Sequence, residues 1–228
     1  MTDAIVIAIL FIFALAGYKK GLIRSAISLV STGVALIMSF IVYPLINMLL
    51  KVTPIYTGIY EGTLKRVEAI DFGKGLQTQG NAILTNMNWL PQIVTEQVRS
   101  NNNSAMYEML GVRTLQEYIA TYVTNMIISL LAILITWFII KVLLSGGLRA
   151  MGGIVEHLPV ISTFNRGGGL IFGILKGVVT LSLIGLIIPV MINYPFFQML
   201  SEAIEGSTLT KWLYDNNFIL LIYNHYVG

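Results

Sequence analysis

The side chains that most often perform catalysis or bind metals are sparse in this sequence. There are two histidines, His157 and His225, and no cysteine, which excludes disulfides, thiolate metal sites and a cysteine nucleophile. His157 follows Glu156, but no further ligand accompanies this pair at a metal-binding spacing. No serine lies in a Gly-x-Ser-x-Gly motif, and residues 167–169 lack the Lys-Ser/Thr that follows in a phosphate-binding loop. We therefore expect no enzymatic activity, no metal and no cofactor.

Small residues recur at four-residue intervals in two parts of the chain. On a helix, residues four apart drift by only about 40°, so each set predicts a face on which another helix backbone can approach closely. The predicted helix-packing residues are Gly17, Gly21 and Ser25 in the first set and Gly169, Gly173 and Gly177 in the second. Because one chain carries two such faces, we also expect a homo-oligomer.

A cation accompanies each set at the same relative position: Arg24 in the first and Lys176 in the second. An unpaired charge at membrane depth is costly, so both residues are candidate functional groups that need partners. We expect the carbonyl groups of residues 146–168, the Asn165 side chain or lipid phosphates to bind them. The alternative is that both cations are simple anchors that face the headgroups.

The two sets extend into a weak internal similarity, because residues 17–33 align with residues 169–185. One interpretation is a pair of parallel, structurally equivalent hairpins, as some membrane folds contain. The other is that both segments need small residues and a cytosolic anchor independently. The sequence leaves both interpretations open.

The composition identifies the environment of these residues. Of the 228 residues, 56% are hydrophobic and 11% are charged, whereas soluble domains carry about 25% charged residues. Four apolar stretches approach the roughly 20 residues that span a bilayer: 4–18, 25–50, 118–140 and 169–193. The sequence thus predicts an all-α membrane protein with four transmembrane helices arranged as two hairpins, residues 1–50 and 118–193.

Three other segments complete the predicted organisation. Residues 51–117 hold six basic and six acidic residues and predict a mostly helical insert, with Thr114 and Glu117 as a capping box before the third span. Residues 143–168 are rich in glycine and predict a re-entrant or interfacial element. Residues 194–228 predict an amphipathic interfacial helix. A tail helix packed on the insert is the alternative.

The distribution of charge predicts the topology. The segments joining spans one and two and spans three and four hold seven basic residues and one acidic residue, and the rest of the chain holds seven basic and ten acidic residues. Since basic loops stay in the cytosol, both termini and the insert are expected on the outer side. The net charge of +3 is too small to indicate nucleic-acid binding.

The stretch from Pro159 to Gly177 carries a family resemblance. Its Pro159, Asn165-Arg166, Gly169, Gly173 and Lys176-Gly177, together with Asp3, Gly17, Gly21 and Arg24 near the N-terminus, resemble the CvpA (colicin V production) family. The resemblance implies a multi-pass protein of the bacterial plasma membrane. It also implies a part in colicin V production or export, a form of toxin biosynthesis, and in stress resistance of the cell envelope. Asp3, Arg24, Pro159, Asn165, Arg166 and Lys176 are its candidate functional residues.

Two functional classes follow from these observations. The first, which we favour, is an accessory or scaffold protein that uses the insert for envelope or secretion proteins and the basic face for anionic lipid. The second is an oligomeric channel or transporter for a small solute or ion. The second is weaker, because the span centres carry almost no ionisable groups and four helices enclose little space.

Overall fold

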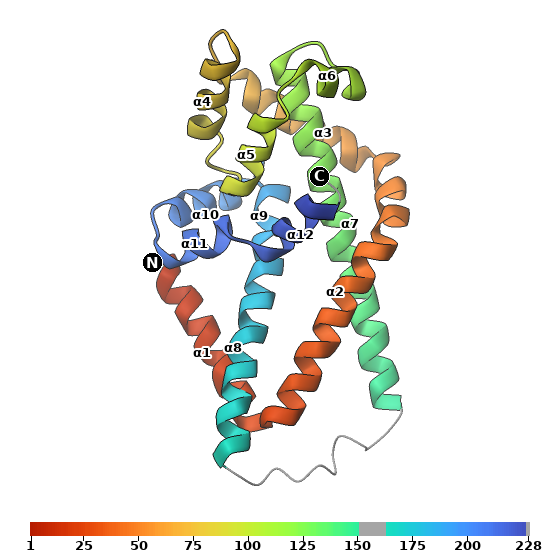
Figure 1. Cartoon of the computed structure of the whole chain (residues 1–228), viewed down its shortest axis with the longest axis vertical. Coiled ribbons are helices and arrows are strands. Elements are labelled where there is room, and N and C mark those ends of the chain that lie inside the picture. The colour runs from red at the N-terminus through yellow and green to blue at the C-terminus, as the bar shows by residue number, and fades with distance from the viewer. Residues whose placement is uncertain (151–162, 227–228) are drawn as a thin grey trace. The chain divides into compact units, whose positions relative to one another are not determined.

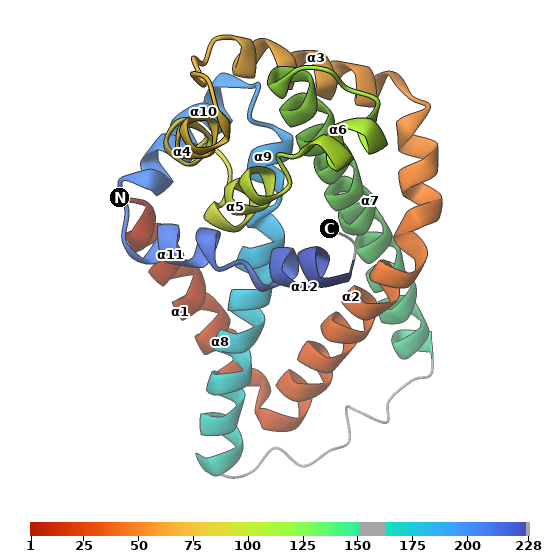
Figure 2. The same ribbon diagram turned by 45° about the horizontal axis from the view of Figure 1, so that its top comes forward.

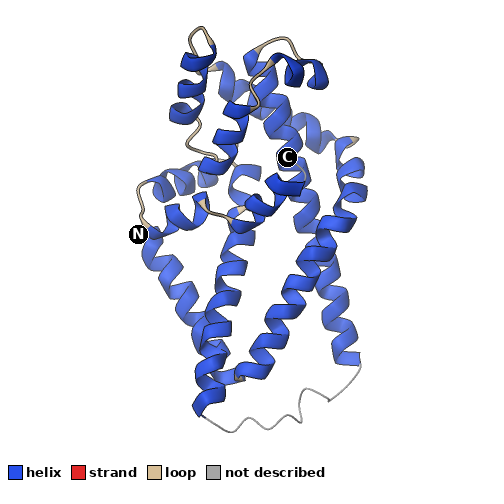
Figure 3. Cartoon of the chain, viewed as in Figure 1, coloured by secondary structure: helices blue, strands red, loops and turns tan. Residues whose placement is uncertain are grey.

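The computed structural model describes residues 1–150 and 163–226. Over these ranges the chain forms helices and no strands (Figure 3). This confirms the predicted all-α class.

Four helices are long and apolar enough to cross a membrane, as the hydropathy pattern predicts. They are α1 (Thr2–Lys20), α2 (Leu22–Lys51), α7 (Leu115–Ala150) and α8 (Thr163–Gly185). The capping box at the start of α7 is also confirmed. The Glu117 amide donates to Thr114 Oγ1 at 3.2 Å, and Glu117 Oε2 accepts from the Thr114 amide at 3.3 Å. These two bonds satisfy donors that the first turn of a helix leaves unpaired.

The chain changes direction between α1 and α2 at a single residue, Gly21. Its φ of 77° lies in the region that glycine adopts without steric cost. The Gly21 amide still donates to the Gly17 carbonyl at 2.9 Å, and the Ser25 amide donates to the Gly21 carbonyl at 3.1 Å. The corner nevertheless interrupts the helical hydrogen bonds, because the Leu22 amide donates to the Asn165 side chain.

The described chain divides into two compact units. Unit 1 comprises residues 1–46 and 132–183, and unit 2 comprises residues 47–131 and 184–228. Unit 1 contains α1, most of α2, the second half of α7 and most of α8 (Figure 1). Unit 2 joins the predicted insert and the C-terminal tail in one body.

The insert in unit 2 is helical, as predicted. Its helices are α3 (Pro54–Glu68), α4 (Leu76–Asn86), α5 (Gln92–Ser100) and α6 (Ser104–Leu110). Val67, Ile83, Met87 and Tyr118 are fully buried. The Tyr118 hydroxyl donates to the Val98 carbonyl at 2.8 Å. The core of this unit therefore draws on three insert segments and the first turn of α7.

The tail forms several short helices where one interfacial helix was expected. These are α10 (Pro195–Glu205), α11 (Leu209–Asp215) and α12 (Phe218–Tyr226), which follow α9 (Ile187–Val190). The Tyr214 hydroxyl donates to the Trp89 carbonyl at 3.2 Å, and Asp215 Oδ1 accepts from the Gln92 amide at 3.0 Å. Figure 2 shows α12 beside α5. The structure thus matches the alternative of a tail packed on the insert.

The predicted element at residues 143–168 is described only at its two ends. Residues 143–150 continue α7, and residues 163–168 begin α8. Pro159, Glu156 and His157 lie outside the described residues, so a re-entrant element there stays a prediction. Because α8 begins at Thr163, Asn165 and Arg166 belong to its first turns.

Candidate functional site

The two sets of small residues meet where α1 packs on α8 in unit 1. A Cβ atom at Gly17 would lie 2.8 Å from the Gly173 Cα and closer still to the Gly169 carbonyl oxygen. A Cβ atom at Gly177 would lie 3.0 Å from the Leu10 side chain. Figure 1 shows the two helices crossing at this level. Only glycine allows the two backbones to come this close.

The first set does not form one helix face, which corrects the prediction of a continuous small-residue face there; the equivalence of the two hairpins stays a prediction. Gly17 belongs to α1, Gly21 is the corner and Ser25 belongs to α2, where its hydroxyl donates to the Gly17 carbonyl at 3.2 Å. The second set, by contrast, lies on the single helix α8. The two sets face each other within one chain, so neither set is left to pack against a second copy. The homo-oligomer therefore stays a prediction, without the support of these residues.

Asn165 joins the start of α8 to the start of α2. Its Oδ1 accepts from the Leu22 amide at 2.8 Å, which is the first amide of α2. A Cβ atom at Gly21 would lie 2.7 Å from Asn165 Nδ2, so the corner glycine also makes room for this amide. The neighbouring Arg166 guanidinium lies over the Tyr18 ring at 5.9 Å from its centroid. Asn165 therefore acts as a cap across two spans.

Lys176 has a partner that the sequence analysis did not name. Its Nζ donates to the Ser28 hydroxyl of α2 at 2.7 Å. Lys141 of α7 does the same one turn further along α2, where its Nζ donates to Ser31 Oγ and Thr32 Oγ1, both at 3.0 Å. Ser28, Ser31 and Thr32 stand at positions i, i+3 and i+4, so their hydroxyl groups form a stripe along one face of α2. The two cations therefore bind the same stripe, although they come from the different spans α7 and α8.

The remaining resemblance residues are Asp3, Arg24 and Pro159, and of these Arg24 lies one turn before Ser28 on α2. Asp3 lies in the first turn of α1, at the far end of that helix from Gly17, and Arg24 lies in the first turn of α2. Both are half-buried. Pro159 lies outside the described residues.

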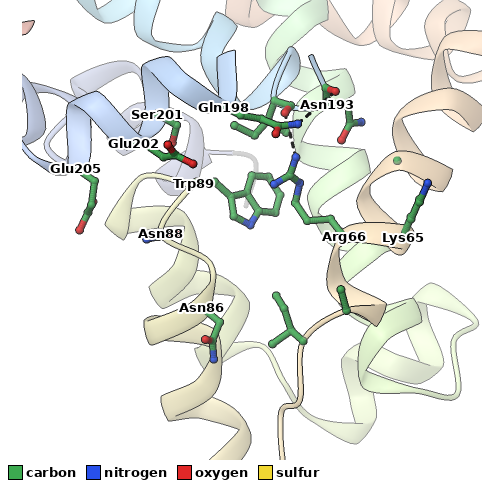
Figure 4. A pocket seen from close by; sticks show the side chains of 14 residues that line it. Lys65, Arg66, Asn86, Asn88, Trp89, Asn193, Gln198, Ser201, Glu202 and Glu205 are labelled. Atoms are coloured by element: carbon green, nitrogen blue, oxygen red, sulfur yellow. Dashed lines mark hydrogen bonds between the residues drawn. The ribbon is translucent and has the colours of Figure 1, made fainter. Parts of the chain in front are cut away.

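A pocket in unit 2 escaped the sequence analysis. Its volume is about 720 Å³, within the range of small-ligand sites. Helix α3, the turn between α4 and α5, residues 192–193 and helix α10 line it (Figure 4). Across residues 1–150 and 163–226, no three histidine or acidic side chains lie close enough together to hold a metal ion. The polar side chains that line it are Lys65, Arg66, Asn86, Asn88, Trp89, Asn193, Gln198, Ser201, Glu202 and Glu205.

Arg66 and Trp89 form the floor of this pocket. The Arg66 guanidinium lies over the Trp89 ring, 5.4 Å from its centroid, and Nη2 donates to the Ile192 carbonyl at 3.0 Å. Burial lowers the pKa of Arg66, although an arginine stays charged at neutral pH. Trp89 is only 6% exposed.

Two donors on this floor lack an acceptor. In the described part of the chain, neither the Trp89 indole N–H nor the Arg66 Nε–H has a hydrogen-bond partner. An unpaired buried donor costs about 1–3 kcal/mol, and more when it belongs to a charged group.

Acidic residues lie on the opposite side of Trp89 from Lys65 (Figure 4). Glu205 shares one cation with Asp215, because Lys211 Nζ lies 2.6 Å from Glu205 Oε2 and 3.3 Å from Asp215 Oδ2, so the three groups together remain negative. Partial burial lowers the pKa of Lys211, but the hydrogen bond that Lys211 donates to Glu205 and the charge of Asp215 outweigh it, so the pKa rises. Glu202 is exposed and pairs with none of the described cations. The pocket thus has a cationic and an anionic end.

Gly62 allows the two walls of the pocket to meet. A Cβ atom at this position would lie 2.8 Å from Asn193 Cγ and closer still to the amide nitrogen. The Asn193 side chain can therefore rest on α3. The sequence held one signal for this site, a tryptophan inside an otherwise polar insert, but nothing local linked it to Arg66 or to residues 192–205.

Comparison with known proteins places most of the chain in one family. The family model of the colicin V production protein matches residues 2–70 and 104–217. These ranges include the glycine contacts of unit 1, Arg66 and α10, whereas α4, Trp89 and α5 lie in the unmatched segment 71–103. Neither the curated proteins nor the solved structures gave a significant match. The match and the four apolar helices together show that the chain is a multi-pass membrane protein of the CvpA family, a family implicated in colicin V production.

Proposed function

We propose that this protein is a non-enzymatic accessory protein of the bacterial plasma membrane that binds an envelope or secretion partner through the pocket around Arg66 and Trp89. The pocket carries this proposal, because it combines a ligand-sized volume with cationic side chains at one end and acidic side chains at the other. Unit 1 supplies the membrane anchor, whose α1 and α8 pack at glycine contacts. The family name connects the proposed activity with colicin V production.

The charge distribution supports an extracytoplasmic location for unit 2. The two basic segments that predict the cytosolic side are residues 19–24 and 141–176, and unit 2 lacks such an excess of basic residues. A ligand of the pocket would then come from the outer side of the membrane, or it would belong to a partner that crosses the membrane.

A channel or transporter for a small anion is the second candidate. The observation that favours it is the pair of ammonium groups, Lys141 and Lys176, bound to hydroxyls along α2 within apolar helices. Ionisable groups inside spans often mark ion pathways. Anion flux through reconstituted liposomes that disappears in Lys176→Met would favour this candidate, whereas the accessory function predicts no flux.

Photo-crosslinking in cells tests the accessory function. We expect p-benzoylphenylalanine at Asn88, an exposed residue of the pocket, to form a discrete adduct with a partner. The adduct should disappear when Arg66→Gln is added, because the partner loses its anchoring cation. The same probe at Glu108, an exposed residue of α6 outside the pocket, is the matched control. Identical adducts at both positions, or an Asn88 adduct that is indifferent to Arg66→Gln, would contradict the proposal.

A further inference from the structure

We propose that helix α10 is an interfacial membrane-binding helix, whose exposed apolar face lies in the headgroup layer of the leaflet beside unit 2. Phe196, Met199 and Ala203 form this face, and lipid is its proposed occupant. The inference goes beyond the proposed function, because it concerns a surface of unit 2 other than the pocket.

Helix α10 presents three different sides. At about 100° per residue, Phe196, Met199 and Ala203 fall within one sector of about 60°, and all three are exposed. A second sector, centred about 140° from the first, holds the side chains that line the pocket: Gln198, Ser201, Glu202 and Glu205 (Figure 4). The sector between them holds the residues that pack in the core of unit 2: Phe197, Leu200 and Ile204.

The fold of unit 2 therefore uses two sides of α10 and leaves the apolar side uncovered by any described part of the chain. Phe196 is 61% exposed and Met199 is 62% exposed. Packing of α10 in unit 2 and binding to a membrane surface are thus compatible, because different sides of the helix serve them.

The exposed face of α10 continues the apolar surface of the last span. No charged residue lies between Lys176 and Glu202, so most of α8, all of α9 and the first turns of α10 form one uncharged run. Exposed apolar side chains recur along the part of this run that leads from the span into α10: Ile184, Ile187, Met191 and Tyr194. A surface that begins in contact with lipid therefore reaches α10 without a charged interruption, which favours lipid over a protein as its occupant.

Helix α2 also carries its lipid-facing side into unit 2. Ile41, Leu45 and Met48 are spaced by four and three residues, so they share one side of the helix, and each is at least 65% exposed. Unit 2 begins at residue 47, within this stripe. A helix of 30 residues is about 45 Å long, which matches the thickness of a bilayer with its headgroup layers. The first residues of unit 2 therefore lie at the level of the headgroups, where α10 is proposed to bind.

The residue types on α10 suit the headgroup layer. Interfacial helices bury large apolar side chains about 5–10 Å into the boundary between headgroups and acyl chains and keep their polar side toward water. The acidic residues of α10, Glu202 and Glu205, lie on its pocket side. The Phe196 ring meets the Phe197 ring edge-on, with 5.2 Å between centroids, so a lipid contact at Phe196 also supports the core. Binding of lipid on this face would hold the pocket toward the aqueous phase.

Spin labelling of the full chain in liposomes of phosphatidylcholine and phosphatidylglycerol tests the inference. Because the chain has no cysteine, Met199→Cys, Ala203→Cys and Glu202→Cys each place a single label on α10. Molecular oxygen concentrates in lipid and a nickel chelate stays in water, so their relative collision rates report the surroundings of the label. We expect oxygen to dominate at Met199→Cys and Ala203→Cys, and the nickel chelate to dominate at Glu202→Cys on the pocket side.

Two results would overturn the inference. Dominance of the nickel chelate at all three positions would show that the apolar face meets water. Low collision rates of both reagents at Met199→Cys and Ala203→Cys would show that a second copy of the chain covers the face in place of lipid.

A pair of substitutions tests whether the apolar face holds α10 at the membrane. Phe196→Gln combined with Met199→Gln should shift the label at Ala203→Cys from dominance of oxygen to dominance of the nickel chelate. The matched control combines Leu76→Gln with Met109→Gln, at residues of α4 and α6 that are 69% and 70% exposed, and should leave the label in lipid. The same response of the label to both pairs, whether shifted or unshifted, would contradict the assigned role of the face.

The membrane contact and the proposed function fail in different ways. The expected pattern of collision rates without an Arg66-dependent adduct at Asn88 would preserve the membrane contact and reject the partner. The adduct without that pattern would preserve the partner and reject the membrane contact.

Discussion

Alanine at Gly17 is expected to lower the free energy of unfolding by about 3 kcal/mol, at the upper end of the cost of overpacking. The new methyl group would collide with the Gly169 carbonyl oxygen and lie 2.8 Å from the Gly173 Cα. Both obstacles are backbone atoms of α8, so no side-chain rotation relieves the contact and the helices must move apart. Thermal unfolding in detergent, followed by circular dichroism, measures the effect.

Gly33 of α2 provides the matched control, because a Cβ atom there meets nothing within 4 Å. Gly33→Ala should raise stability by about 0.5–1 kcal/mol, since alanine loses less conformational freedom than glycine when a helix forms. Equal effects of the two substitutions would show that the approach of α1 to α8 does not hold unit 1 together.

Alanine at Tyr214 is expected to destabilise unit 2 by about 3–5 kcal/mol, the usual cost of truncating a large buried aromatic residue. Tyr214 is 7% exposed and packs with Ile188 and Ile204, and burial raises the pKa of its hydroxyl. Its hydroxyl also holds the Trp89 carbonyl, so the substitution should loosen the turn that carries the pocket floor. Urea unfolding, followed by tryptophan fluorescence, measures the effect.

Tyr226 serves as the control for this substitution. It lies at the end of α12 and is 76% exposed, so Tyr226→Ala should change stability by no more than about 0.5 kcal/mol. If Tyr214→Ala were as mild as Tyr226→Ala, the contact between the tail and the insert would contribute nothing to unit 2.

Features with a local signal were predicted from the sequence. The four spans follow from runs of apolar residues, and the start of α7 follows from Thr114 and Glu117, which are three residues apart. The family follows from motifs such as Gly169, Gly173 and Lys176, which the family match confirms. In each case, neighbouring residues carry the whole pattern.

Features that depend on contacts between distant segments were missed or assigned to the wrong partner. The expected partners of Lys176 were the carbonyl groups of residues 146–168, the Asn165 side chain or lipid phosphates, and they did not include Ser28, which lies 148 positions away. Arg66 attracted no attention, because its partner Ile192 lies 126 positions further along the chain. Spacing arguments describe one helix face at a time and do not indicate which faces meet.

The tail illustrates an intermediate case. Its aromatic residues were consistent either with a membrane interface or with packing on the insert, because both environments favour amphipathic aromatic rings. The structure distinguishes them through Tyr214 and Asp215, which bind backbone groups at residues 89 and 92. Composition alone carries no information about such partners.

The most direct test of the account is whether the pocket opens to the outside of the cell. The chain has no cysteine, so Asn88→Cys places a single thiol at an exposed position of the pocket and Lys19→Cys places one at an exposed position of a basic segment. With a membrane-impermeant maleimide added to intact cells, the account predicts labelling of Asn88→Cys and none of Lys19→Cys until the cells are broken. Labelling of Lys19→Cys in intact cells, with Asn88→Cys protected, would place the pocket in the cytosol and contradict it.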